Sequence, residues 1–127
     1  MIIAGLVFAA LAAALHVYIF ALESLWWMRP RTRGVFGVSV EEARATREFA
    51  FNQGFYNLFL ALMVIVGCVL APRIPAAGYA LVFAGTGSML AAALVLSSRG
   101  KRRRRAAFAQ GCLPLIALVL LIAGRVG

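Results

Sequence analysis

The chain has 127 residues, of which 64% are hydrophobic and only 13% are charged. A soluble domain carries roughly 25% charged residues, and one of this size could not hide so much apolar surface, so lipid must cover the remainder. The net charge of +9 does not indicate nucleic acid as a partner, because the Lys and Arg residues lie almost wholly in two short segments between apolar runs.

The first apolar run extends from Ile2 to about Met28 and predicts a transmembrane helix over 2–28, since about 20 apolar residues cross a hydrocarbon core of about 30 Å. A secretory signal peptide is the alternative for this run. We favour the transmembrane helix because no basic segment precedes the run, the apolar stretch is long, and it contains His16 and Glu23.

The basic segment 29–47 follows, and its Pro30 ends the first helix. Ser39 has the character of an N-cap, with Glu41 and Glu42 in the turn after it. This pattern predicts a short interfacial helix that runs on into the second membrane helix.

Three further apolar runs predict membrane helices at about 48–70, 76–97 and 106–124. Glycines and alanines are frequent in the third run, and small residues let membrane helices approach closely. Pro114 interrupts the fourth run and predicts a kink. The predicted fold is therefore an all-α bundle of four transmembrane helices, with a short interfacial helix before helix two, in one domain over 1–127.

The basic residues are distributed unevenly among the loops. Five lie in 29–47 and six in 99–105, whereas the second loop holds only Arg73 and the C-terminal segment only Arg125. Positively charged loops stay in the cytoplasm. We therefore predict a multi-pass membrane protein, with loops one and three cytoplasmic and both termini external.

Polar side chains gather at one level of the predicted bundle. His16 and Glu23 are seven residues apart, so they share one face of helix one. Four-residue spacings place the polar side chains of helix two on one broad face, and Gln110 enters from the same side on helix four. The helix-two set consists of Glu48, Asn52, Gln53, Tyr56 and Asn57.

An acidic side chain inside a membrane helix costs about 2.5 to 3.5 kcal/mol on insertion scales, so such residues face the bundle interior and usually mark function. We therefore predict Glu23 and His16 as catalytic residues, with His16 or a helix-two amide as the partner of Glu23. The predicted substrate-binding residues are Asn52, Gln53, Tyr56, Asn57 and Gln110. We expect five of these polar residues to line one cavity: His16, Glu23, Asn52, Tyr56 and Gln110. No metal or other cofactor is predicted, because one histidine and two isolated cysteines, Cys68 and Cys112, do not supply a usual zinc site.

Structural interpretations compete with each of these assignments. Amides and tyrosines serve as interhelical hydrogen-bonding groups that contribute about 0.6 kcal/mol each on average. Glu48 lies beside Arg47 and is more typical of a charge at a helix start. Trp26 and Trp27 lie where an interfacial belt is expected. The arginines at 102–105 set topology and contact lipid, and a specific head-group site is the alternative for them.

Four segments, HVYIFALE, RGVFGVS, FNQGFYNLFLA and AQG, together resemble the domain-of-unknown-function 1304 family of small bacterial membrane proteins, over nearly the whole chain. The most specific part is the run from Asn52 to Asn57, and His16, Glu23 and Gln110 match the family's other polar positions. The arginine block at 102–105 is heavier than the family's pattern. The resemblance implies the membrane fold and a location in the bacterial inner membrane, and it brings no particular activity.

The leading functional hypothesis is a membrane enzyme that performs acid/base chemistry on an apolar or lipid-like small molecule. Isomerisation, cyclisation or epoxide opening suits such residues, because each needs proton transfer. The rival is a small homo-oligomeric proton-coupled transporter or channel. The predicted partners are membrane lipids and an apolar or lipid-like small molecule, with no nucleic acid. A homo-oligomer is left open as the alternative to a single copy.

Overall fold

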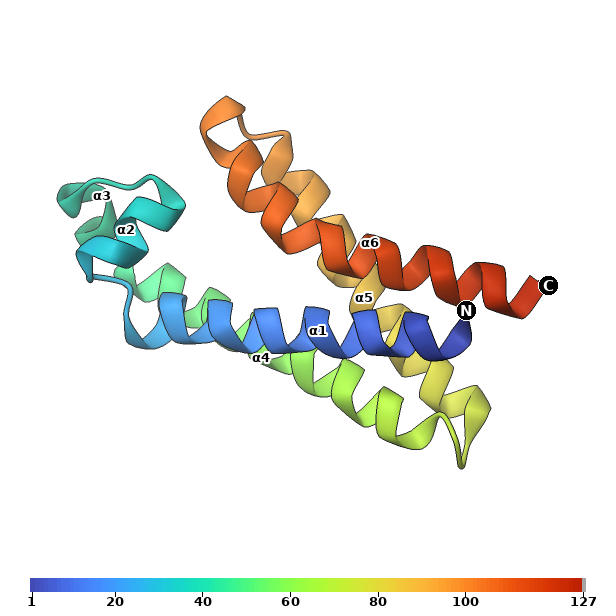
Figure 1. The fold of residues 1–127 in the computed structure, drawn as a ribbon. Coiled ribbons are helices and arrows are strands. Elements are labelled where there is room, and N and C mark those ends of the chain that lie inside the picture. Colours follow the sequence, from blue (N-terminus) through green and yellow to red (C-terminus); the bar gives the residue numbers. More distant parts are fainter. Residues whose placement is uncertain (127) are drawn as a thin grey trace.

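Four long helices form a bundle in the computed structural model, which describes residues 1–126 (Figure 1). The predicted domain also includes Gly127, which lies outside the described residues. The first helix, α1 (Ile2–Phe20), continues as a π-helical turn, η1 (Ala21–Leu25). The other three are α4 (Arg47–Leu70), α5 (Pro75–Ser97) and α6 (Arg104–Val126). All four are long and apolar enough to cross a membrane, so the chain is a small multi-pass all-α membrane protein.

The helices form a closed ring in which α1 and α5 each pack against both α4 and α6. Small residues dominate the centre, as close packing between membrane helices requires. The buried core consists of Ala9, Ala12, Ala13, Ala61, Val64, Val82, Met89, Ala117 and Leu121. The prediction of close approach along α5 is confirmed, since Gly78 lies against Ala71 and Gly85 against Val64.

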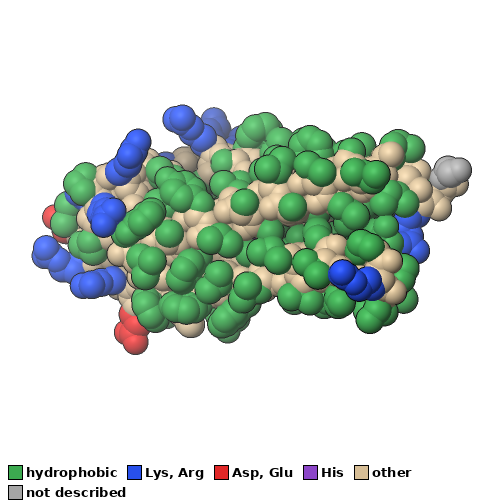
Figure 2. Space-filling model, turned by 60° about the horizontal axis from the view of Figure 1, so that its bottom comes forward, with side chains coloured by type: hydrophobic (Ala, Val, Ile, Leu, Met, Phe, Trp, Pro, Cys, Tyr) green, Lys and Arg blue, Asp and Glu red, His purple; other side chains and the backbone are tan. Residues whose placement is uncertain are grey.

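Both basic loops lie at one end of the bundle, and the N-terminus, the C-terminal part of α6 and the α4–α5 turn lie at the other (Figure 1). Arg102 in the third loop reaches Glu42 in the first, at 3.4 Å between Nη2 and Oε1. Figure 2 shows most of the visible Lys and Arg side chains at one end of the bundle, a few at the other end, and hydrophobic side chains over the part between the two ends. The predicted shared side of loops one and three is therefore confirmed, and which side faces the cytoplasm stays a prediction.

Helix one ends earlier than the sequence predicted, at Leu25 rather than Met28. Trp26 leaves the helical conformation, and Trp27 turns towards the first loop, where its Nε1 donates to the Ala43 carbonyl at 2.9 Å. Hydropathy does not detect this end, because both tryptophans are apolar. Pro30 also begins a helix, α2 (Pro30–Phe36), since its fixed φ and missing N–H suit the first helical position.

The predicted interfacial helix is confirmed as α3 (Val40–Ala45). Ser39 Oγ accepts from the Glu42 backbone N–H at 3.1 Å, and Glu42 Oε2 accepts from the Ser39 backbone N–H at 2.9 Å, which together form a capping box. The Ser39 N–H holds the pKa of the Glu42 carboxyl below its ordinary value, and Arg102 adds to this effect. α3 ends at Ala45 and α4 starts at Arg47 as a separate helix, because Thr46 between them leaves the helical conformation. The expectation that the interfacial helix runs on into the second membrane helix is therefore wrong.

Candidate functional site

A buried carboxyl and a buried amide meet where η1 lies against α4. Asn57 Nδ2 donates to Glu23 Oε2 at 2.7 Å, and the two side chains are only 6% and 8% exposed. The Asn57 amide also donates, more weakly, to the backbone carbonyl of Gln53 at 3.3 Å. Of the two partners expected for Glu23, the structure therefore selects an amide of the second membrane helix.

The π-helical turn and a glycine bring these groups together. In η1 the Trp26 N–H bonds to the Ala21 carbonyl five residues earlier, at 2.9 Å, which widens the last turn. Opposite this turn, Gly54 has no side chain, and a Cβ there would lie 3.0 Å from the Ser24 backbone nitrogen. The close approach lets Ser24 Oγ donate to the Phe51 carbonyl at 2.8 Å. Helix one is thereby fixed to α4 directly beside Glu23.

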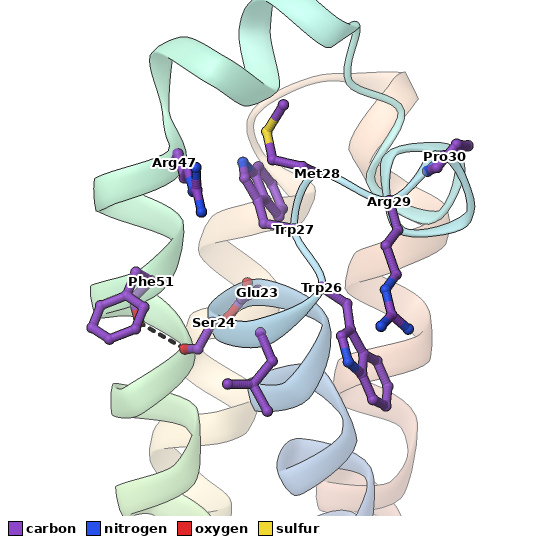
Figure 3. Close-up of a pocket in the computed structure, with 10 residues that line it drawn as sticks. Glu23, Ser24, Trp26, Trp27, Met28, Arg29, Pro30, Arg47 and Phe51 are labelled. Carbon is purple, nitrogen blue, oxygen red and sulfur yellow. Dashed lines mark hydrogen bonds between the residues drawn. The ribbon is translucent and has the colours of Figure 1, made fainter.

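A cavity of about 490 Å³ opens beside Glu23 at the end of the bundle that carries the basic loops. Its lining comes from η1, from the segment that follows it, and from the first turns of α4 (Figure 3). The lining residues are Glu23, Ser24, Leu25, Trp26, Trp27, Met28, Arg29, Pro30, Arg47 and Phe51. This volume lies within the range of small-molecule sites.

The cavity combines three kinds of chemistry. Glu23 supplies a carboxyl group, and the tryptophans and Phe51 supply apolar surface. Two guanidinium groups lie on opposite sides, Arg47 at the start of α4 and Arg29 beside Trp26 (Figure 3). The Arg29 guanidinium lies 4.9 Å from the centre of the Trp26 ring, so a cation–π contact holds it over the aromatic wall. Arg47 faces the cavity from the start of α4. Such a cavity can hold an apolar chain and an anionic group together, with a carboxyl beside them.

Residues 10–122 match the family described as "Protein of unknown function (DUF1304)". The match covers most of the 127 residues. The chain belongs to the DUF1304 family. No curated protein and no solved structure matches it. Residues 16–110, which hold every predicted site position of this DUF1304 chain, all lie within the matched range.

His16, the second predicted catalytic residue of this DUF1304 protein, is buried on α1 and only 2% exposed. Its Nδ1 lies 2.8 Å from the Ala12 carbonyl, one turn earlier on the same helix. His16 does not line the cavity. The seven residues that separate it from Glu23 correspond to about 10 Å along a helix. The structure thus places both groups inside the bundle and only Glu23 at the cavity.

The polar residues of α4 divide between two faces. Asn57 faces the bundle, whereas Asn52 and Gln53 are exposed and Tyr56 is 59% exposed. The inward face is formed by small residues such as Ala50 and Gly54 instead. The expectation that Asn52 and Tyr56 line one cavity with Glu23 is therefore wrong, because close packing of α4 against η1 requires the small-residue face. Whether Asn52, Gln53 and Tyr56 bind a substrate stays a prediction.

Gln110 is half-buried near the start of α6, and it does not line the cavity. Glu48 is exposed on the first turn of α4, as a charge at a helix start is expected to be. Among the described residues, no three His, Cys, Asp or Glu side chains lie close enough to hold a metal ion together.

Several cavity residues were absent from the sequence prediction. Ser24, Arg47 and Phe51 carry no special spacing, and Trp27 was interpreted only as a belt residue. The one available signal was their position in the sequence, near Glu23 at the end of the first membrane helix or at the start of the second. These two helix ends lie on the same side of the bilayer. Sequence spacing within one helix does not report contacts across two helices, so these residues required the fold.

Proposed function

We propose that this DUF1304 protein is a membrane enzyme that uses Glu23 for proton transfer to and from a lipid-like molecule bound in the cavity. One observation carries the proposal: a carboxyl group that is 8% exposed lies in the wall of a cavity of about 490 Å³ and is held there by Asn57. A carboxyl inside a membrane helix is costly and usually functional. This one also has space beside it for a reactant.

The character of the lining supports an amphipathic substrate. Tryptophan, methionine and phenylalanine side chains would contact an apolar chain, and Arg29 and Arg47 would bind an anionic head group. The cavity lies at the end of the bundle with the basic loops, which we propose faces the cytoplasm, with both termini external in a bacterial inner membrane. A molecule that partitions into the inner leaflet would reach the cavity without crossing the bilayer.

The proposed chemistry is redox-neutral. In an isomerisation, Glu23 would accept a proton from one carbon of the substrate and return it to another; cyclisation and epoxide opening need the same kind of proton transfer. The Asn57 amide would orient the carboxyl by donating to one oxygen, which leaves the second oxygen for the substrate. His16, about 10 Å deeper on α1, would then support the bundle around Glu23 rather than touch the same molecule.

Glu23→Gln tests the proposal, because the amide keeps the size and hydrogen-bonding ability of the side chain but cannot exchange a proton. Glu48→Gln is the matched control, since Glu48 is an exposed carboxyl on the first turn of α4. Membrane lipid extracts from a deletion strain complemented with each variant would be compared by mass spectrometry, with unfolding in detergent measured in parallel.

We expect Glu23→Gln to fold and to leave the substrate pool unconverted, whereas Glu48→Gln restores the wild-type lipid profile. If Glu23→Gln restores that profile as well as the wild type does, the carboxyl has no part in chemistry and the proposal fails.

A proton-coupled transporter is the second candidate, favoured by the burial of both His16 and Glu23 along one helix. Purified protein in liposomes separates the two functions. Chemical conversion of a lipid-like substrate without a proton gradient supports the enzyme, whereas gradient-driven movement of an unchanged solute supports the transporter.

A further inference from the structure

The outward face of α4 carries an unusual polar stripe. Asn52 is exposed, and so is Tyr56 one turn later, at 59%. Asn52 lies two residues from both Ala50 and Gly54, which are buried, and two helical residues correspond to 200° of rotation. Asn52 and Tyr56 therefore point away from the bundle interior, and Gln53 flanks them.

The stripe reaches into the apolar part of the membrane span. Asn52 lies about 8 Å and Tyr56 about 14 Å along the helix from Arg47, at 1.5 Å per residue. Hydrocarbon offers no hydrogen-bonding partner to an amide or a hydroxyl group. Within the described residues, the side chains of Asn52, Gln53 and Tyr56 make no hydrogen bond. These groups need partners from outside the chain.

Exposed aromatic rings flank the stripe. Phe49 is 78% exposed and Phe59 is 56% exposed, on the same side of α4. Aromatic residues are enriched in protein interfaces, and amides act as hydrogen-bonding groups between membrane helices. The composition of this face is therefore that of a helix–helix interface rather than of a surface covered only by lipid.

We propose that a second copy of this chain docks on this face, with α4 against α4 about a two-fold axis along the membrane normal. Two copies have the same orientation in the membrane, so their α4 helices run parallel and Asn52 meets Asn52. An amide both donates and accepts, so identical side chains satisfy each other across the axis.

This dimer is independent of the proposed function, because it rests on the face of α4 opposite to the one that contacts Glu23. Lipid alone, or a different protein, are the other possible occupants of the face. The experiment must therefore identify what lies against Asn52 and must show that its side chain contributes to binding.

Disulfide cross-linking in native membranes identifies the occupant. In a background with Cys68→Ala and Cys112→Ala, Asn52→Cys is compared with Phe108→Cys, which lies at a similar depth on α6 and is 74% exposed in the native chain. We expect Asn52→Cys to form a covalent dimer roughly tenfold faster, because two cysteines at a two-fold axis meet the required spacing. Equal rates at the two positions, or a cross-link from Asn52→Cys only to a different protein, would overturn the proposal.

Asn52→Leu tests the energetic role of the amide by fluorescence energy transfer between labelled copies diluted into lipid bilayers. Loss of an interhelical hydrogen bond weakens association roughly threefold to twentyfold, whereas Phe108→Leu leaves it unchanged. If lipid covers the face, the apolar Asn52→Leu has no cost and association does not fall. That result refutes the dimer interface.

Discussion

Gly54→Ala tests the contact between α4 and η1 that positions Glu23. A Cβ at this position would lie 3.0 Å from the Ser24 nitrogen, 3.1 Å from Glu23 Cβ and closer still to Ser24 Oγ. The hydroxyl group can rotate away only by giving up its bond to the Phe51 carbonyl. The Ser24 nitrogen and Glu23 Cβ are held in place by the backbone of η1, so they can move only if α4 and η1 separate.

The magnitude follows from three contributions. Overpacking costs about 1 to 3 kcal/mol, and the lost hydrogen bond costs about 0.5 to 1.5 kcal/mol. Replacing glycine by alanine inside a helix returns about 1 kcal/mol. We therefore expect Gly54→Ala to lower the free energy of unfolding by roughly 0.5 to 3.5 kcal/mol.

Gly87→Ala is the matched control, because a Cβ at Gly87 in α5 meets no atom within 4 Å. It should raise the free energy of unfolding by up to about 1 kcal/mol, since only the helix propensity changes. Both variants would be unfolded reversibly by sodium dodecyl sulfate in mixed micelles, with helicity followed by circular dichroism. Equal changes in the two variants would refute the close contact at Gly54.

Three further predictions concern the site, the topology and the first loop. Asn57→Ala leaves the Glu23 carboxyl without its amide, and we expect the free energy of unfolding in micelles to fall by about 1 to 3 kcal/mol; an unchanged value would mean that the hydrogen bond contributes nothing. In Ser98→Cys, the cysteine in the third loop should be protected from an impermeant thiol reagent on intact cells, whereas in Arg73→Cys the cysteine in the second loop should be labelled. The reverse pattern would mean that the proposed orientation is inverted. The pKa of Glu42 is lower in the folded chain than its ordinary value of about 4.3, so its contribution to stability is present above that pH and is lost as the pH falls through the folded pKa. The stability difference between wild type and Glu42→Gln should therefore disappear on acidification, and a difference that persists at low pH would contradict this cause.

The spans and the ends of most helices could be predicted from the sequence. Transfer of a segment from water to lipid depends mainly on its composition and length, so hydropathy located α4, α5 and α6 to within about two residues. The cap at Ser39 was equally accessible, because a capping box involves residues three apart in one turn. The end of helix one at Leu25 was not, because the π-helical turn and the bond from Trp27 to Ala43 depend on neighbouring elements.

The candidate site was predicted in part. The sequence alone determined that Glu23 lies inside the bundle, because a carboxyl in a membrane helix is costly when it faces lipid, and an amide on the second membrane helix was one of its two expected partners. Only the tertiary structure decided that this amide is Asn57 and that Asn52 and Tyr56 face outwards. The physical reason is that α4 has a polar face and a small-residue face. Helical periodicity locates both faces but does not tell which of them packs against the neighbouring helices. Contact with η1 selects the face of Ala50 and Gly54, because only small residues allow the two backbones to approach, and Asn57 lies on that face.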